Sequence, residues 1–198
     1  YGSSSELGAK LQVPYYFALA PHRDITFSPS ITSKEGVVLS GEFREHSKNG
    51  KLEFTGSITR PDERDEENRK TGKKKIRGHI EANGLYEVDP AWRWGFKARR
   101  STDDTYLKRY DISSDDTLTS NAFIESLRDS SYTNVNFYSF QGLRSDDDPG
   151  DSPTIFPEIS YSFDSQPGPF GETWGANASA LILNRSSGTD SHRLSLST

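Results

Sequence analysis

The chain has 198 residues, of which 31% are hydrophobic and 12% aromatic, and this supply of aromatic side chains argues against a disordered protein. The formal net charge of −5 gives no support for nucleic-acid binding, and the absence of cysteine excludes disulfides and thiolate metal sites within the chain. No run of about 18 apolar residues predicts a membrane helix. The 4 histidines show no metal spacing and no G-x-S-x-G motif occurs, so we expect no cofactor.

The first two predicted strands each contain an interior proline. Residues 7–21, LGAKLQVPYYFALAP, alternate apolar and polar side chains around Pro14, and residues 24–32 do so around Pro29. Proline has no N–H to donate, so strand prolines are confined to edges and bulges. A pairing that keeps the apolar faces together places the two prolines one position apart across the hairpin. They predict a locally weakened sheet, and protection of an edge from aggregation is the alternative.

Two turn signals follow. The sequence KNG at 48–50 is typical of a two-residue hairpin turn, and the register that it predicts places Phe43 opposite Gly56. The sequence KEG at 34–36 fits a three-residue turn with Gly36 in the left-handed region. Both turns keep apolar residues on one face, which favours a meander of antiparallel strands.

The rest of the chain continues the two-residue period and shows no helical period. Further strands are expected at 37–44, 52–59, 75–88, 92–99, 118–128, 133–143, 157–164, 174–184 and 191–198. Long connections are expected at 61–74, about 101–117 and 144–156, and short ones at 89–91 and 129–132. We therefore predict an all-β fold, an antiparallel up-and-down meander whose two rims differ.

A sheet with one apolar and one charged face suits a soluble sandwich or the wall of a transmembrane β-barrel. Strands of about 10–13 residues, longer than the usual five or six, favour a segment of a large barrel. The charged face would then line the lumen. Its candidate contacts for lipid phosphates, with a solvated wall as the alternative, are Lys10, Arg44, Lys75, Arg77, Arg93, Lys97 and Arg99. The alternative fold is a soluble β-sandwich that binds or cleaves carbohydrate with carboxylates such as Glu42 and Glu81.

Residues 13–46 resemble the start of the β-barrel of the LptD family, the LPS-assembly or organic solvent tolerance proteins. The resemblance depends on Pro14-Tyr15-Tyr16, Ala20-Pro21, Asp24-Ile25-Thr26, Pro29 and Gly41-Glu42-Phe43-Arg44. Residues 103–120, DDTYLKRYDISSDDTLTS, also resemble the family. Elsewhere the resemblance is one of strand pattern alone, and the family's cysteines have no counterpart.

The resemblance implies an integral protein of the Gram-negative outer membrane that inserts lipopolysaccharide into the outer leaflet without catalysis. It implies a lateral gate at the first strands, with Pro14, Tyr15, Tyr16 and Pro29 as gate residues. The implied partners are lipopolysaccharide, membrane lipid, an LptE-type plug lipoprotein in the lumen and a periplasmic bridge reached through an N-terminal domain. On this interpretation residues 1–198 are one partial barrel domain of about nine or ten strands, without that N-terminal domain or the rest of the barrel.

Overall fold

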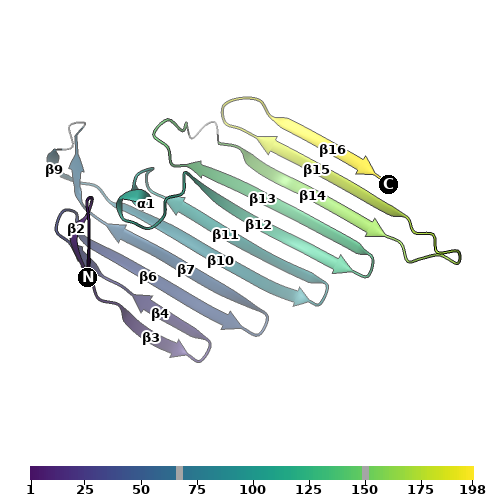
Figure 1. Cartoon of the computed structure of the whole chain (residues 1–198), viewed down its shortest axis with the longest axis horizontal. Helices are drawn as coiled ribbons and strands as arrows, with labels where there is room; N and C mark the ends of the chain where they lie inside the picture. Colours follow the sequence, from purple (N-terminus) through teal and green to yellow (C-terminus); the bar gives the residue numbers. More distant parts are fainter. Residues whose placement is uncertain (66–68, 149–151) are drawn as a thin grey trace.

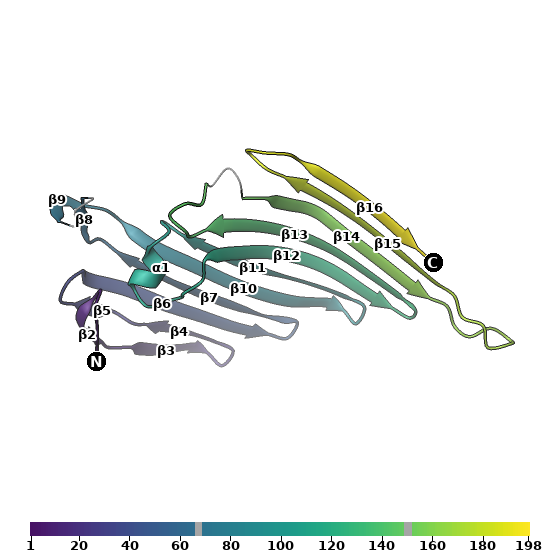
Figure 2. The ribbon, with the colours of Figure 1, turned by 45° about the horizontal axis from the view of Figure 1, so that its top comes forward.

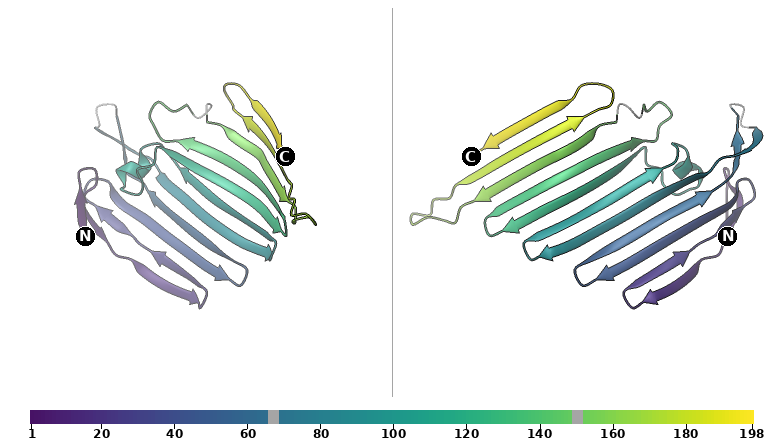
Figure 3. Two further views of the ribbon diagram at one scale, coloured as in Figure 1. Left: turned by 45° about the vertical axis from the view of Figure 1, so that its right-hand side comes forward. Right: turned by 180° about the vertical axis from the view of Figure 1, so that it is seen from behind.

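The computed structural model describes residues 1–65, 69–148 and 152–198. In these residues 14 strands form one antiparallel sheet, and β8 (Asp62–Arg64) pairs with β9 (Lys70–Lys74) as a separate hairpin. The predicted all-β antiparallel meander is confirmed. The sheet is open, with the N-terminal strands at one edge and the C-terminal strands at the other (Figures 1 and 3).

From β6 onward the long strands follow one another across the sheet in chain order. They are β6 (Gly36–Ser47), β7 (Gly50–Thr59), β10 (Arg77–Asp89), β11 (Trp92–Ser101), β12 (Thr117–Arg128), β13 (Ser131–Gly142), β14 (Thr154–Asp164), β15 (Gly175–Asn184) and β16 (Ser191–Ser197). Gly36 has the expected left-handed φ, 80°. The three expected long connections all lie at one rim of the sheet. Residues 165–174 form a further long connection at the other rim, so long and short connections do not alternate strictly between the two rims.

The first hairpin is broken into two halves. The expected strand at 7–21 is two strands, β2 and β3, and the expected strand at 24–32 is also two, β4 and β5. Their bounds are β1 (Gly2–Ser4), β2 (Gly8–Gln12), β3 (Tyr15–Ala20), β4 (Arg23–Phe27) and β5 (Ser30–Thr32). β2 pairs with β5 and β3 with β4, while β4 and β5 both pair with β6. In Figures 1 and 2 the β2–β5 half lies apart from the β3–β4 half.

The register predicted from 48–50 is wrong by two residues. Phe43 lies opposite Phe54, because Ser47 pairs with Gly50 and the turn lies one residue earlier than expected. Gly50 is needed for a different reason: β10 passes so close that a side chain at this position would clash with the backbone of Leu85. The predicted faces survive, because a shift of two residues returns each side chain to the same side of a strand.

The sequence does not predict helix α1 (Tyr106–Arg109), a single turn within the connection from β11 to β12. α1 lies over one face of the sheet (Figure 2). This is the polar face, where the hydroxyl of Tyr106 lies 2.6 Å from Oγ of Ser57. The buried hydrophobic side chains gather around it: Leu7, Val38, Tyr106, Leu107, Tyr110, Leu118 and Leu143. In the residues that the structure describes, no helix is long and apolar enough to cross a membrane.

The apolar face of the sheet is uncovered in the described part of the chain. Large apolar side chains lie exposed on it from edge to edge: Phe17, Leu39, Phe54, Ile58, Ile80, Trp94, Ile124, Ile159 and Leu194. The predicted separation into an apolar and a polar face is therefore confirmed. The small hydrophobic core lies on the polar side, under α1, and the extended apolar face is therefore of the size that marks an interaction surface.

Candidate functional site: the broken edge hairpin and the polar face

Pro14 and Pro29 interrupt the first hairpin, and the N–H group that each lacks would have faced a different side of its strand. The backbone N–H of Val13 donates to the carbonyl of Pro29 at 3.1 Å. The reciprocal bond, from residue 29 to the carbonyl of Val13, is the one that proline removes. Since hydrogen-bonded and non-bonded pairs alternate, the nitrogen of Pro14 faces away from the hairpin, toward the free edge of the sheet. The prolines lie one position apart, as expected, but only Pro29 weakens the hairpin itself.

The free edge next to these prolines is short. β1 pairs with β2 from Gly8 to Lys10 and covers that part of the edge, whereas β3 pairs only with β4 among the described strands. Tyr15 and Tyr16 on β3 are 51% and 61% exposed. The six residues of β3 span about 20 Å, and over this length the described chain gives the edge no partner.

The other half of the hairpin is tied to α1. Leu7, which precedes β2, belongs to the buried cluster around the helix. In the turn before β6, Glu35 is almost fully buried and accepts a bond of 3.1 Å from Arg109 of α1, while Nζ of Lys34 donates to the carbonyl of Ser5. The β2–β5 half is thus fixed to the polar face, and the β3–β4 half pairs only with β6 beyond itself.

Most of the basic residues expected on the lumen side contact carboxylates. The pairs are Arg44 with Asp24 at 3.0 Å, Arg77 with Asp103 at 2.5 Å, Arg93 with Glu125, Lys97 with Glu81 at 3.5 Å, and Arg99 with Glu81 at 3.1 Å and Asp115 at 2.6 Å. Lys10 lies half-buried on β2. Lys75 lies in the connection before β10 and not on a strand, which corrects its expected place on the wall. The polar face is therefore a network of neutralised charges.

Glu42 and Glu81, the carboxylates considered for carbohydrate chemistry, belong to this network. Glu42 lies 3.6 Å from Nε of Arg44, and Glu81 contacts both Lys97 and Arg99. Both carboxylates are thus already held by neighbouring cations, whereas acid–base cleavage of a glycosidic bond requires two carboxylates free to flank that bond. This geometry gives no support to carbohydrate cleavage.

The connection that carries α1 is anchored by a nearly buried ion pair. Both nitrogens of the Arg77 fork bond Asp103, at 2.9 and 2.5 Å, and the side chains are 12% and 17% exposed. Burial acts to raise the pKa of Asp103, but the hydrogen bonds and charge of Arg77 outweigh it and lower the pKa below its usual value. Hydrogen bonds from Arg99 likewise lower the pKa of Asp115, and burial raises the pKa of Tyr110 to about 12.

Within the described ranges, Ser57 and His79 form the one serine–histidine contact that could suggest a nucleophile. Oγ of Ser57 lies 2.8 Å from Nδ1 of His79 and 2.6 Å from the hydroxyl of Tyr106. Because α1 covers Ser57, which is 9% exposed, no substrate reaches its hydroxyl, and the contact serves to hold α1. The described residues contain no group of three or more His, Cys, Asp or Glu side chains that could hold a metal ion.

Asp103, Tyr106 and Arg109 are the residues of this site that sequence reasoning did not assign a role. The available signal was a group of large apolar side chains, Tyr106, Leu107 and Tyr110, inside an otherwise charged connection. Apolar residues at such spacing form one side of a helical turn.

Comparisons with known proteins agree on one family. The model of the family LptD, LPS transport system D, matches residues 75–198, more than half of the chain. Relatives that carry the name LPS-assembly protein LptD include the following three proteins. The protein from Pseudomonas entomophila is 39% identical over 97 residues, which cover 45% of this chain and 10% of that protein. The protein from Polaromonas is 49% identical over 55 residues (28% and 7%), and that from Idiomarina loihiensis 28% identical over 114 residues (56% and 14%). The chain spans only a small part of the length of these relatives.

Proposed function

The chain belongs to the LptD family, and from this premise we propose that it is one segment of an outer-membrane β-barrel that inserts lipopolysaccharide into the outer leaflet. In this proposal residues 1–198 form a single partial barrel domain, and the remaining strands close the barrel. The exposed apolar face lies in lipid and the ion-paired face lines the lumen. The protein acts as a transporter and performs no catalysis.

The observation that carries the proposal is the broken first hairpin. A gate needs an edge that can separate while the rest of the wall stays paired. The β3–β4 half offers such an edge, because Pro29 removes a bond where this half joins the β2–β5 half and Pro14 removes a donor from the edge itself. Each lost hydrogen bond corresponds to about 1 kcal/mol in water and to more in lipid. Tyr15 and Tyr16 line the proposed opening.

The lumen offers two kinds of contact in this proposal. Lipopolysaccharide phosphates meet the basic residues of the polar face by replacing some of the carboxylates that now neutralise them. The candidates remain Lys10, Arg44, Lys75, Arg77, Arg93, Lys97 and Arg99. An LptE-type lipoprotein fills the rest of the lumen, and the periplasmic bridge delivers lipid through a domain outside this chain.

The gate is tested by restoring the missing donors in the full-length protein. The double variant Pro14→Val, Pro29→Val should pair more tightly at the edge and slow lipopolysaccharide export, while heat-modifiable migration shows that the barrel still assembles. Pro21→Ala, in the turn at the tip of the same hairpin, is the matched control and should export normally. Normal export in the double variant would refute the gate, whereas loss of assembly in both variants would show a general folding defect.

A further inference from the structure

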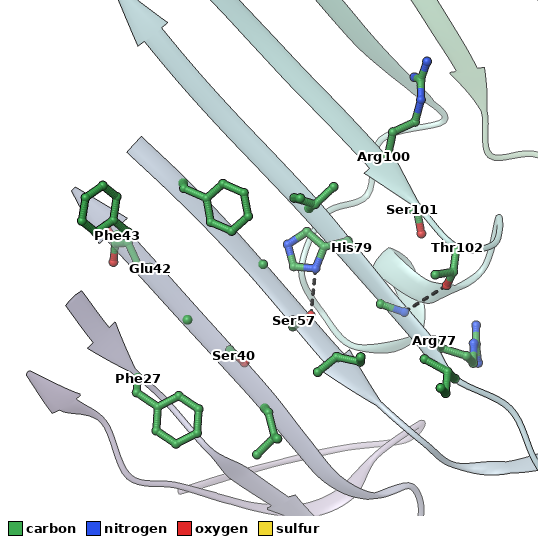
Figure 4. A pocket seen from close by; sticks show the side chains of 18 of the residues that line it. Phe27, Ser40, Glu42, Phe43, Ser57, Arg77, His79, Arg100, Ser101 and Thr102 are labelled. Carbon is green, nitrogen blue, oxygen red and sulfur yellow. Dashed lines mark hydrogen bonds between the residues drawn. The ribbon is translucent and has the colours of Figure 1, made fainter. Parts of the chain in front are cut away.

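A hollow of about 740 Å³ opens on the apolar face over β6, β7 and β10 (Figure 4). Gly41 and Gly56 lie directly opposite each other at its floor, where the sheet has no side chains to project. The apolar walls include Ile25, Phe27, Leu39, Phe43, Phe54 and Ile58. Its volume is typical of sites that hold a small ligand, and its walls suit hydrocarbon chains.

One end of this hollow carries a positive charge. The cross-strand row that starts at Gly56 continues through Ile80 to Arg100, about 10 Å away across two strand spacings. In Figure 4 Arg100 lies at the end opposite Phe27. Its guanidinium donates to the carbonyl of Arg99 at 3.3 Å and to Oγ of Ser139 at 2.7 Å, both neutral oxygens.

Arg100 differs in this respect from the arginines of the polar face. Those at positions 44, 77, 93 and 99 contact carboxylates, whereas within the described residues Arg100 contacts none. An arginine without a counter-ion beside a membrane-facing surface attracts an anion, and its planar fork matches a phosphate. The charge and the apolar hollow are thus complementary to the two ends of one amphipathic molecule.

We propose that this hollow binds one anionic glycerophospholipid, with its acyl chains over Gly41 and Gly56 and its phosphate at Arg100. The inference depends on the proposed function only in that the apolar face must lie in a membrane. The single free cation selects a lipid with one phosphate. A lipid with several phosphates would require more cations at this end, and Arg77, the other arginine beside the hollow, is already held by Asp103.

The test is native mass spectrometry of the delipidated full-length protein in detergent, titrated with phosphatidylglycerol or with diacylglycerol, which lacks the phosphate. Arg100→Gln should weaken phosphatidylglycerol binding about tenfold or more, as expected for the loss of a charge-assisted hydrogen bond, and leave diacylglycerol binding unchanged. Arg128→Gln is the matched control, because Arg128 is an exposed strand arginine that lies over Trp92 instead of the hollow. Equal effects of the two variants would overturn the proposal.

A second variant tests the hollow itself. A Cβ at Gly41 would have no neighbour nearer than 3.9 Å, so Gly41→Leu should fill the hollow without disturbing the sheet and abolish binding of both lipids. Ala98→Leu adds the same bulk to the same face outside the hollow and should leave binding intact. Tighter binding of a lipid with several phosphates, or unchanged binding in Gly41→Leu, contradicts the proposal. No export step enters these measurements, so their failure is distinct from failure of the gate.

Discussion

Replacing Tyr106 by alanine should release the connection that carries α1 from the polar face and leave the sheet folded. Tyr106 is fully buried, its ring lies 4.6 Å from that of Tyr110, and its hydroxyl bonds Ser57. Removal of a buried aromatic side chain costs about 3–5 kcal/mol. A helix of one turn has no stability of its own, so this loss falls on the connection. The β-ladders do not depend on Tyr106 and should persist.

Hydrogen–deuterium exchange of the full-length protein in detergent measures this release. Peptides covering 102–116 should exchange roughly 100- to 4000-fold faster in Tyr106→Ala, because each 1.4 kcal/mol corresponds to a factor of ten. Tyr106→Phe should give only about a fivefold change, since it loses one hydrogen bond. Tyr132→Phe is the matched control and should give no change at 102–116, because the Tyr132 hydroxyl bonds Glu125 within the ladder of β12 and β13. Unchanged exchange at 102–116 in Tyr106→Ala, or faster exchange throughout β10 and β11, would refute the reasoning.

Two further outcomes are expected. Gln141→Ala should speed hydrogen exchange at the end of β11. The ladder between β11 and β12 ends before Ser101, and the Gln141 amide replaces it by bonding the backbone N–H and carbonyl of Ser101 at 3.1 and 2.8 Å. Unchanged exchange at the end of β11 would contradict this prediction. Acid should loosen 102–116: the lowered pKa of Asp103 means that its pairing with Arg77 stabilises the fold above about pH 4 and is lost as the pH falls further. Exchange corrected for its intrinsic pH dependence should therefore be constant from about pH 5 to 8 and rise below about pH 4, and a rise centred near pH 6 would point to another group.

Period two in the sequence predicts most of this fold because the pleat imposes it on every strand. Phe54, Ile80 and Ile159 alternate with charged or polar neighbours, and the structure places all three on the exposed apolar face. This prediction needs no knowledge of which strands pair, because odd-numbered and even-numbered residues of a strand face opposite sides of the sheet.

The register and the site depend on contacts between distant segments, which local patterns do not encode. Asn49-Gly50 is a strong turn signal, but the glycine is required by the close passage of β10, which begins 27 residues later. Pro14 and Pro29 were recognisable as interruptions, yet the side of the strand that each affects follows only from the bond between Val13 and Pro29. α1 was not predicted because a single turn of four residues is too short for the helical period to repeat.

The strand that caps β2 has a consequence for any separation at this edge. Unpairing that starts at the tip of the β3–β4 hairpin can travel along β3 as far as Pro14, where the ladder is already interrupted. Farther along, β1 covers the edge at Gly8–Lys10, and Leu7 and Glu35 join the next turns to α1. In the proposed gate the opening would therefore have a fixed length, set by the distance between a turn and a proline. A more strongly destabilised edge would open more frequently in this proposal, but the length of β3 that unpairs would stay the same.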